Sequence, residues 1–503
     1  MVLDKIRGKL TGSKESSSKK SKGKNATLSF DLLYQLSYMS VIAAAGVPRS
    51  HIFERSAQLP CATSDYFRKV ELNCRKLKYD YAKACRLVGE SAKEEEIKAL
   101  LLRFSSSLLS GEPESDFLTR EAEAQAEAYN NEYGRKLETL KLWTDAYVSL
   151  ILSAVLVIIM GIVSTMIWKI ETIFIVGLAV AAISTTMLGV WLIYLMSPKE
   201  VMVLNWAGSK EQKLTVKLFK LLVPTALAAF SIIGFVGNNL GWGLIIGAAI
   251  ILPIGFISAR GDKKVTRRDS EVGSFLRSLG GVCAAIGTTV REALNRIDMD
   301  SINNLRHEVK RLHTRLIAGI SARLCWHRFI EETGSELINR SVGMFYDAIE
   351  LGGEPERAGH YSSIFASNIA MLRARRKTVS SPFRWLCIAM HAAIIVLLVF
   401  ITEVITIFGN MVANAEQAMP TISGAPSVGA FTSFNFSGLQ LMHSFVMPLV
   451  IVFTIANALA PSIADGGSHY KILYNLAITA IISGTSLIFL PSIAGSLFGS
   501  VQM

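Results

Sequence analysis

Long apolar runs alternate with polar, helix-patterned segments along the chain. A helix needs about 20 mostly apolar residues to cross the roughly 30 Å hydrocarbon core of a bilayer. Seven stretches qualify: 146–168, 173–196, 221–240, 240–258, 385–408, 441–460 and 472–498. The third and fourth are short, Pro224 and Pro253 interrupt them, and a polar turn at 237–239 separates them. The pattern predicts an all-α polytopic membrane protein.

Two polar regions, 27–145 and 259–384, carry the spacing of amphipathic helices. In the first, apolar residues recur in steps of three or four at Phe67, Val70, Cys74, Leu77, Tyr81 and Ala84. The second repeats the pattern at Ile302, Leu305, Val309, Leu312 and Leu316. Such spacing puts an apolar stripe on one helix face. The opposite faces are basic, with Arg68, Lys69, Arg75, Lys76 and Lys78 in the first region and Arg306, Lys310, Arg311 and Arg315 in the second.

The two polar regions resemble one another. An aromatic residue precedes a glycine by twelve positions in both, from Tyr34 to Gly46 and from Phe275 to Gly287, and an Ala pair lies just before each glycine. Further on, Ser110, Gly111, Glu112, Pro113 and Glu114 match Gly352, Gly353, Glu354, Pro355 and Glu356. Both anchors are separated by about 241 residues, which indicates a duplication. An even number of spans lies between the copies, so both face the same side of the membrane and the repeat is parallel rather than inverted.

The shared Gly-Glu-Pro-Glu element predicts a tight turn between two helices. Glycine closes a helix in the left-handed conformation, and proline suits the first turn of the next helix. Glutamates near a helix N-terminus are favoured by about 0.3–1 kcal/mol. They could cap the helix, or they could contact a partner at the bundle tip. Few helix breakers follow between 115 and 168, so one helix could continue from the first bundle into the membrane.

The distribution of Lys and Arg predicts the orientation. Net charge is +12, yet the loop 409–440 has no Lys or Arg, and Glu416 is its single charged residue. The loop 197–219 and the region 259–384 are basic. Because basic loops stay on the cytoplasmic side, we expect both bundles inside and the C-terminus outside.

Five segments follow from these patterns: a Lys/Ser-rich tail at 1–26, the first bundle at 27–145, four spans at 146–258, the second bundle at 259–384, and three spans at 385–503. The tail lacks the apolar core of a cleavable signal peptide. A glycosylation-type triplet at 435–437 falls on the expected outer loop, although such triplets are common by chance.

The candidate chemistry is sparse. The six cysteines form no C-x-x-C pair, so we interpret them as reduced packing residues and expect no metal site and no cofactor. Glu403 and His391 lie inside a predicted span, where a charge costs about 2.5–3.5 kcal/mol. Glu403 could reach interfacial water or pair with another span. His391 could be hydrogen-bonded packing or a proton relay.

Catalytic signatures are missing from the sequence. It contains no G-x-x-x-x-G-K-[ST] loop, no H-E-x-x-H and no G-x-S-x-G motif, and we predict that the chain is not an enzyme. It also has no nucleic-acid-binding motif, so nucleic acid is not an expected partner.

The Ala-Ala-Ala-Gly46-Val-Pro opening, its partner at Ala-Ala-Ile-Gly287 and the two Gly-Glu-Pro-Glu turns resemble a known family. The layout of a helical bundle followed by spans, used twice, adds to the resemblance. The family comprises the platform proteins of type II secretion (the F-domain family) and of type IV pilus machines. The fused length is most similar to archaeal archaellum or pilus platforms, which are related to tight-adherence pilus proteins. The resemblance covers roughly 27–170 and 260–410.

The resemblance implies a membrane platform beneath a growing filament. In that family a hexameric cytoplasmic secretion ATPase docks on the soluble bundles, and pilin- or archaellin-type subunits pass from the membrane into the filament. It also implies a homodimer in contact with membrane lipids. Glu403 could then also bind the terminal amine of a pilin-type subunit. The basic helix faces would then be ATPase-docking candidates, although they could instead be solvated or rest on anionic headgroups at about 1 kcal/mol per residue. A transporter or channel and a membrane-bound signalling protein remain the alternative functions.

Overall fold

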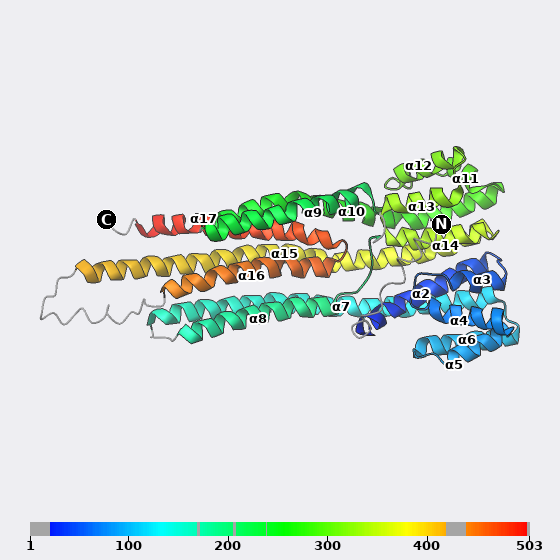
Figure 1. Cartoon of the computed structure of the whole chain (residues 1–503), viewed down its shortest axis with the longest axis horizontal. Helices are drawn as coiled ribbons and strands as arrows, with labels where there is room; N and C mark the ends of the chain where they lie inside the picture. The colour runs from blue at the N-terminus through cyan, green and yellow to red at the C-terminus, as the bar shows by residue number, and fades with distance from the viewer. Residues whose placement is uncertain (1–20, 168–171, 205–207, 238, 419–438, 500–503) are drawn as a thin grey trace, which may run out of the picture. The chain divides into compact units, whose positions relative to one another are not determined.

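The computed structural model describes residues 21–167, 172–204, 208–237, 239–418 and 439–499. In these ranges the regular structure is helical, and one isolated bridge joins Val203 to Ser335 (Figure 1). The predicted all-α polytopic class is confirmed. Most of the Lys/Ser-rich tail, the centre of the loop 409–440 with its 435–437 triplet, and the last four residues lie outside the described ranges.

The chain divides into two compact units. Unit 1 comprises Met1–Gly134, Lys199–Ala207 and Val265–Leu372, and unit 2 comprises Arg135–Pro198, Gly208–Lys264 and Arg373–Met503. Both predicted bundles therefore contribute to unit 1, and the apolar parts of the long helices contribute to unit 2.

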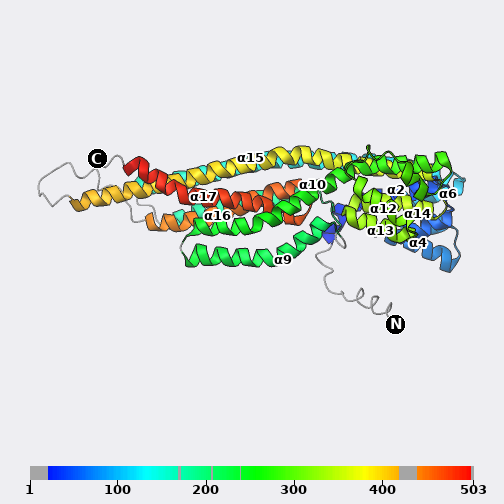
Figure 2. The ribbon, with the colours of Figure 1, turned by 90° about the horizontal axis from the view of Figure 1, so that it is seen from above.

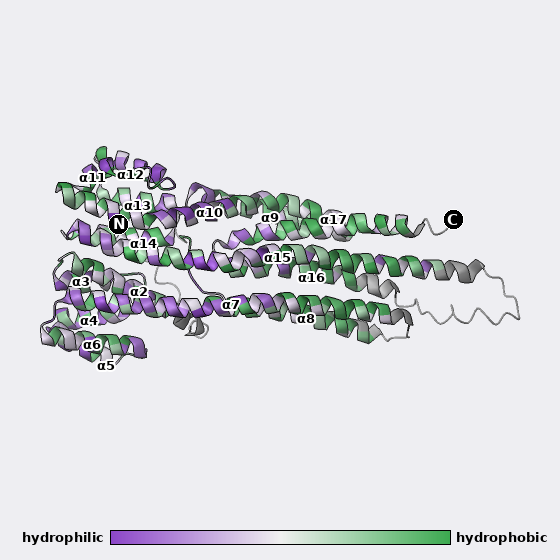
Figure 3. Cartoon of the chain, turned by 180° about the vertical axis from the view of Figure 1, so that it is seen from behind, coloured by the Kyte–Doolittle hydropathy of each residue, from purple (hydrophilic) through white to green (hydrophobic). Residues whose placement is uncertain are grey.

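Seven of the described helices are long and apolar enough to cross a membrane. They are α7 (Glu114–Ile167), α8 (Thr172–Met196), α9 (Lys210–Ser231), α10 (Leu240–Ile286), α15 (Pro355–Ala418), α16 (Leu439–Asp465) and α17 (Ile472–Gly499). Figure 3 shows that their hydrophobic residues gather in the unit 2 portions. As expected, α7 runs unbroken from the first bundle into a candidate span.

The third and fourth spans, α9 and α10, form one hairpin (Figure 2). Pro224 lies inside α9 and Pro253 inside α10, and both helices continue through them. A short π-helix, Ile232–Val236, extends α9. Gly243 lets α10 approach α9 closely, since a Cβ atom there would lie 3.3 Å from the carbonyl oxygen of Phe230. Close packing and local π geometry accommodate prolines in membrane helices.

The predicted basic loop 197–219 is shorter than expected. A capping box forms between Ser209 and Gln212, in which the Ser209 backbone N–H donates to Gln212 Oε1 at 2.8 Å. This reciprocal pairing stabilises a helix start, so α9 begins at Lys210. Lys213 and Lys217 are helical residues and not loop residues.

Unit 1 holds two copies of one helical arrangement. Copy 1 consists of α2 (Ser21–Ala44), α3 (Arg49–Ser56), α4 (Ser64–Leu77), α5 (Tyr81–Glu90), α6 (Glu95–Ser110) and the start of α7. Copy 2 consists of the end of α10, α11 (Val290–Arg296), α12 (Arg306–Ile317), α13 (Ala322–Thr333), α14 (Glu336–Glu350) and the start of α15. Helix α2 is central, because every residue from Leu32 to Ala45 is buried.

The backbone repeats with a constant spacing. The starts of α3 and α11, of α5 and α13, of α6 and α14, and of α7 and α15 are each 241 residues apart. Left-handed residues recur at the same spacing, with Gly46 and Gly287, Lys78 and Gly319, and Gly111 and Gly352 as the pairs. Three turns and four helix starts thus share one register, which supports a duplicated architecture.

This register corrects the residue pairing at the second turn. The sequence match paired Gly111 with Gly353, but the left-handed residue of copy 2 is Gly352, at φ +81°. The hydrogen bonds agree: Glu112 N–H donates to the Ser107 carbonyl at 3.3 Å, and Gly353 N–H donates to the Ala348 carbonyl at 2.9 Å. The two Gly-Glu-Pro-Glu elements are therefore displaced by one position relative to the backbone. The left-handed residue that ends the preceding helix is the first glycine of the Gly352–Gly353 pair, not the second.

The predicted apolar stripe of copy 1 belongs to two helices, not one. Helix α4 ends at Leu77, whose side chain is 57% exposed, and Lys78 adopts a left-handed conformation. Asp80 then caps α5 by accepting the Ala82 N–H at 3.2 Å. In copy 2, all five stripe residues from Ile302 to Leu316 are buried.

The two copies contact each other through α2 and α14. The Tyr38 hydroxyl donates to Asp347 Oδ2 at 2.7 Å. The Arg340 guanidinium lies over the Tyr34 ring, 4.5 Å from its centroid. Arg55 of α3 and Glu350 of α14 add an ion pair at 3.1 Å. These contacts explain why both copies form one compact unit.

Candidate functional site

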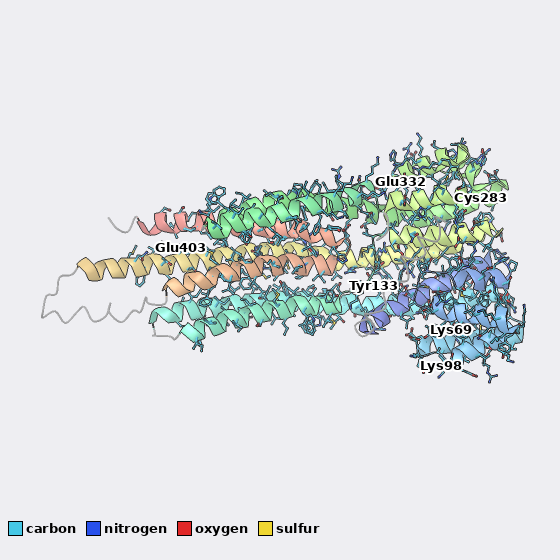
Figure 4. All side chains as sticks on the ribbon, in the orientation of Figure 1. Lys69, Lys98, Tyr133, Cys283, Glu332 and Glu403 are labelled. Carbon is cyan, nitrogen blue, oxygen red and sulfur yellow. The ribbon has the colours of Figure 1, made fainter. Side chains whose placement is uncertain are left out.

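The predicted basic face of copy 1 is largely open. Arg68, Lys69, Lys76 and Lys78 are exposed, and Figure 4 labels Lys69 on α4. Arg75 is exposed too, but it pairs with Glu54 at 2.6 Å and Glu71 at 2.5 Å. Exposed ion pairs contribute little to stability, so Arg68, Lys69, Lys76 and Lys78 remain accessible to a partner, whereas Arg75 is also held by the buried Glu71.

The predicted basic face of copy 2 is only half available. Arg306 and Lys310 are exposed, whereas Arg311 and Arg315 are half-buried. Both of these inner arginines pair with Glu332, which Figure 4 labels. Arg311 and Arg315 are therefore partly covered, and their role in ATPase docking stays a prediction.

A buried carboxylate, Glu308, lies beside these pairs, and Arg311 also contacts it at 3.2 Å. Glu308 is 3% exposed and accepts from Arg268 at 2.7 Å. Arg268 also donates to the Thr333 carbonyl at 3.1 Å, at the end of α13. A buried charge is strongly unfavourable without partners, so the acidic residues of copy 2 hold α10, α12 and α13 together.

The glutamates of the copy 1 tip turn bond to side chains. Glu112 accepts from the Ser107 hydroxyl at 2.7 Å and pairs with Arg120 at 2.6 Å. The Ser107 hydrogen bond and then Arg120 hold the pKa of Glu112 below its ordinary value. Glu114 pairs with Arg49 at the start of α3.

In the copy 2 turn, Glu354 pairs with Arg357 at 2.8 Å, and Glu356 is exposed. Pro113 and Pro355 differ by one position relative to the start of the helix that follows each turn. Pro355 is the first residue of α15, whereas Pro113 immediately precedes α7. In both turns the proline stands where a missing N–H is tolerated.

An open pocket of about 260 Å³ adjoins the starts of α7 and α15. Arg120, Arg357 and Tyr361 line it together with the acidic Asp116 and Glu123. Because charges of both signs face this space, the pocket does not define one ligand class.

His391 belongs to a polar network among the apolar helices of unit 2. The Tyr147 hydroxyl donates to Asn457 Oδ1 at 3.0 Å, and Asn457 Nδ2 donates to His391 Nδ1 at 3.1 Å. His391 Nε2 then lies 3.1 Å from the Thr479 carbonyl and 3.0 Å from Ser483 Oγ. With Nδ1 as acceptor, Nε2 carries the hydrogen of a neutral imidazole. Since both ring nitrogens have partners, the geometry favours the packing interpretation.

Glu403 is half-buried within α15, which Figure 4 also shows. The predicted span ended at 408, but α15 continues to Ala418. The helix therefore extends beyond the predicted span, and the interfacial interpretation of Glu403 stays a prediction. The pairing of Glu403 with another group stays a prediction.

Arg376 bonds to four groups of unit 2, and the sequence pattern alone did not single it out. It is 3% exposed. Its Nε donates to the Ala464 carbonyl at 2.9 Å and its Nη1 to the Pro198 carbonyl at 2.9 Å. Its Nη2 donates to Ser197 Oγ at 2.7 Å and to the Ile463 carbonyl at 3.0 Å.

These acceptors lie at the C-terminal ends of α8 and α16. The last carbonyls of a helix lack intrahelical partners, and a cation near them is favoured by the helix dipole. Gly466 leaves room for the guanidinium, because a Cβ atom there would lie 2.8 Å from Arg376 Cζ. The Gly466–Gly467 pair after an apolar run is the signal that sequence reasoning could have used.

The turn after α16 is tied to two further helices. Asp465 accepts from Ser380 of α15 at 2.8 Å and pairs with Lys471. Asp262 of α10 accepts the Ser468 N–H at 3.0 Å. Together with Arg376, these contacts fix one end of the unit 2 helices.

The six cysteines are free, and four of them, including Cys283 in Figure 4, are buried. Within the described ranges, no group of three or more His, Cys, Asp or Glu side chains could hold a metal ion.

Fold and contacts define the class of protein: an all-α polytopic membrane protein with seven candidate spans and a duplicated helical bundle. No family model matches the sequence, and no solved structure matches it. The chain is similar to Flagella accessory protein J of Methanocaldococcus jannaschii, with 24% identity over 436 residues, covering 82% of this chain and 75% of that protein. It is also similar to Flagella accessory protein J of Methanococcus voltae, with 23% identity over 419 residues, covering 80% and 74%.

Proposed function

We propose that this chain is the membrane platform of an archaellum-type filament assembly machine. The observation that carries the proposal is the similarity to two flagella accessory proteins over 82% and 80% of the chain. That coverage is too broad to come from the apolar spans alone. The seven candidate spans and the duplicated bundle agree with a multi-pass scaffold.

In this role both bundle copies face the cytoplasm. The contrast between the basic region 259–384 and a loop at 409–440 without Lys or Arg supports that orientation. Helices α7 and α15 each continue unbroken from a bundle copy into a candidate span. A displacement of either bundle copy can be passed along such a helix to residues in the membrane.

The platform binds a cytoplasmic secretion ATPase and hands pilin-type subunits to the filament base, as a homodimer and without catalysis of its own. The exposed cations of both copies support electrostatic capture of an acidic ATPase surface, since a basic patch steers association and loses that effect in salt. The transporter alternative has less support, because Glu403 and His391 are the ionisable groups that the sequence pattern singled out in its spans, and both ring nitrogens of His391 have hydrogen-bond partners.

A binding experiment with full-length protein in nanodiscs tests the proposal. The secretion ATPase of the same organism should bind, and reversing the charge of four exposed cations, Arg68, Lys69, Arg306 and Lys310, should weaken binding at low salt. Changing the exposed Arg135 to Glu is a control outside the two faces. Absence of ATPase binding, together with normal filaments in a deletion strain, contradicts the proposal.

A further inference from the structure

The turn between α12 and α13 exposes an unusual apolar surface. All eight residues from 317 to 324, here called the knuckle, are exposed. Ile317 is 59%, Ile320 41% and Leu324 50% exposed. Aliphatic side chains that gather on one exposed turn mark a potential contact surface when the fold does not need them.

The equivalent turn of copy 1 shows that the fold does not need them. At the 241-residue spacing, Lys76, Tyr79 and Lys83 occupy the three aliphatic positions. Lys83 Nζ lies 4.3 Å from the Tyr79 ring centroid, so charged and aromatic side chains replace the three aliphatic ones, and Leu77 is the exposed aliphatic residue of that turn. Both turns have the same left-handed position, Lys78 or Gly319, and the same start of the next helix. The backbone therefore tolerates polar side chains at all three positions.

The surroundings of the knuckle are basic. Lys310 is exposed on α12 and Arg323 on α13, and the exposed Arg306 pairs with Asp300 at 3.5 Å. The acidic Glu308 and Glu332 point inward to arginines. The helices α12 and α13 pack side by side, as Figure 1 shows, so their outer side combines an apolar tip with a positive flank.

The remaining apolar residues of α12 argue against a lipid surface as the occupant. Val309, Leu312 and Leu316 are buried in copy 2. A helix that lies on a membrane presents a continuous apolar face along its length, whereas here only the tip is apolar. A compact aliphatic tip with a charged flank fits a pocket on a protein, where buried anchors dominate binding.

We propose that the knuckle inserts into an apolar pocket rimmed by acidic residues on the cytoplasmic ATPase, an inference that rests on the proposed function. The aliphatic side chains supply the anchor, and Arg306, Lys310 and Arg323 complement the acidic rim. The two copies then differ in their contacts, with copy 1 offering charge and copy 2 an apolar anchor.

Three serine substitutions, Ile317→Ser, Ile320→Ser and Leu324→Ser, combined in one full-length protein in nanodiscs of neutral lipid, test the inference. The matched control changes Lys76, Tyr79 and Lys83 to serine. Affinity for the ATPase is measured at low and at high salt. The knuckle variant should bind about tenfold more weakly, as expected for the loss of apolar anchors, and the ratio should persist at high salt. The control should lose affinity at low salt and show little difference at high salt.

The failures are distinguishable. If the unaltered protein does not bind the ATPase, the proposed function itself falls. If it binds and the knuckle variant binds equally well, the knuckle inference is wrong and the proposed function stands. Binding of the unaltered protein, but not of the knuckle variant, to anionic vesicles would identify a lipid contact and overturn the inference. Unchanged thermal unfolding of the variant, expected for exposed positions, confirms that it folds.

Discussion

In each bundle copy the first helix crosses the long helix that follows the tip turn: α2 crosses α7 in copy 1, and α10 crosses α15 in copy 2. The residues at the two crossings differ. In copy 1, Ser40 of α2 and Thr119 of α7 are hydrogen-bonded at 3.1 Å, and the adjacent Met39 and Leu118 are buried. In copy 2, Gly280 and Gly359 stand at the positions equivalent to Met39 and Leu118, and a Cβ atom on either one would lie 3.0 Å from the other's Cα. One crossing is spaced by large side chains, and the other is a close backbone contact.

The same contrast recurs along the two long helices. Arg135 of α7 and Arg376 of α15 are separated by 241 residues, yet Arg135 is exposed and Arg376 is 3% exposed. At the turns, Lys78 adopts a left-handed conformation that Gly319 adopts in copy 2. The difference teaches that the turn positions are shared, while the side chains between them have diverged toward separate packing and contacts.

Replacing Gly359 with leucine, the residue at the equivalent position 118 of copy 1, should have the largest effect on stability. A side chain at Gly359 would meet the Leu276 carbonyl oxygen at 2.6 Å. Because backbone cannot move aside easily, we expect Gly359→Leu to lower the free energy of unfolding by about 3 kcal/mol. Denaturant titration of the full chain in detergent measures it. The control Leu118→Met should stay below about 1.5 kcal/mol, and equal effects at the two positions would refute the difference in crossings.

Removing Arg376 should have the next largest effect. Arg376→Ala leaves four acceptors at the ends of α8 and α16 without their donor, and we expect a loss of about 2–3 kcal/mol. Arg135→Ala removes an exposed cation at the equivalent position and should change stability by less than about 0.5 kcal/mol. Thermal unfolding in the same detergent compares them. A loss for Arg135→Ala as large as that for Arg376→Ala would show that the buried cation has no special role.

Exchanging residues at the left-handed turn sharpens the comparison at smaller scale. A non-glycine residue in this conformation is disfavoured by about 1–2 kcal/mol. Lys78→Gly should therefore raise the melting temperature, with a gain near 1 kcal/mol, and Gly319→Lys should lower it by a similar amount. If both substitutions shift stability in the same direction, the two turns do not share one backbone geometry.

The smallest predicted effect concerns pH and the contact between the copies. Burial raises the pKa of Asp347 above its ordinary value of 3.8, although the hydrogen bond from Tyr38 and the charge of Arg55 oppose the shift. A carboxyl with a raised folded-state pKa contributes stability below its unfolded-state pKa and loses it as pH rises through the folded-state value. As the pH rises above about 4, the native protein should therefore lose more stability than the Asp347→Asn variant.

The amide keeps an oxygen for Tyr38 and avoids a buried charge, so at neutral pH Asp347→Asn should match or exceed the native stability by less than about 1 kcal/mol. Melting temperatures between pH 4 and pH 7 test this. A variant that becomes progressively less stable than the native chain as pH rises would show that the carboxylate stabilises the contact.

Sequence predicted the parts of the fold that depend on local pattern. Apolar runs defined the spans, and a glycine in each copy, Gly46 and Gly287, anchored the repeat. The sequence did not predict side-chain contacts that depend on residues far apart in the chain. Glu332 on α13 pairs with Arg311 and Arg315. The three- and four-residue spacing of apolar residues in α12 cannot reveal this partner on another helix.

Arg376 illustrates the same limit in unit 2. Its acceptors belong to residues 197–198 and 463–464, far from it in the chain. The pairing of Gly111 with Gly353 was wrong by one residue for another reason. The sequence match aligned identical residues, whereas the backbone hydrogen bonds assign the equivalent left-handed conformation to Gly352.

Cysteine accessibility in cells tests the central claim most directly. Single cysteines replace Lys69, Lys310 and Ser423 in a chain whose native cysteines are changed to alanine, and a membrane-impermeant maleimide is added before or after permeabilisation. We predict labelling at 423 in intact cells and labelling at 69 and 310 only once the membrane is opened. Labelling of position 310 in intact cells would place copy 2 outside, beyond the reach of any cytoplasmic ATPase, and would contradict the account.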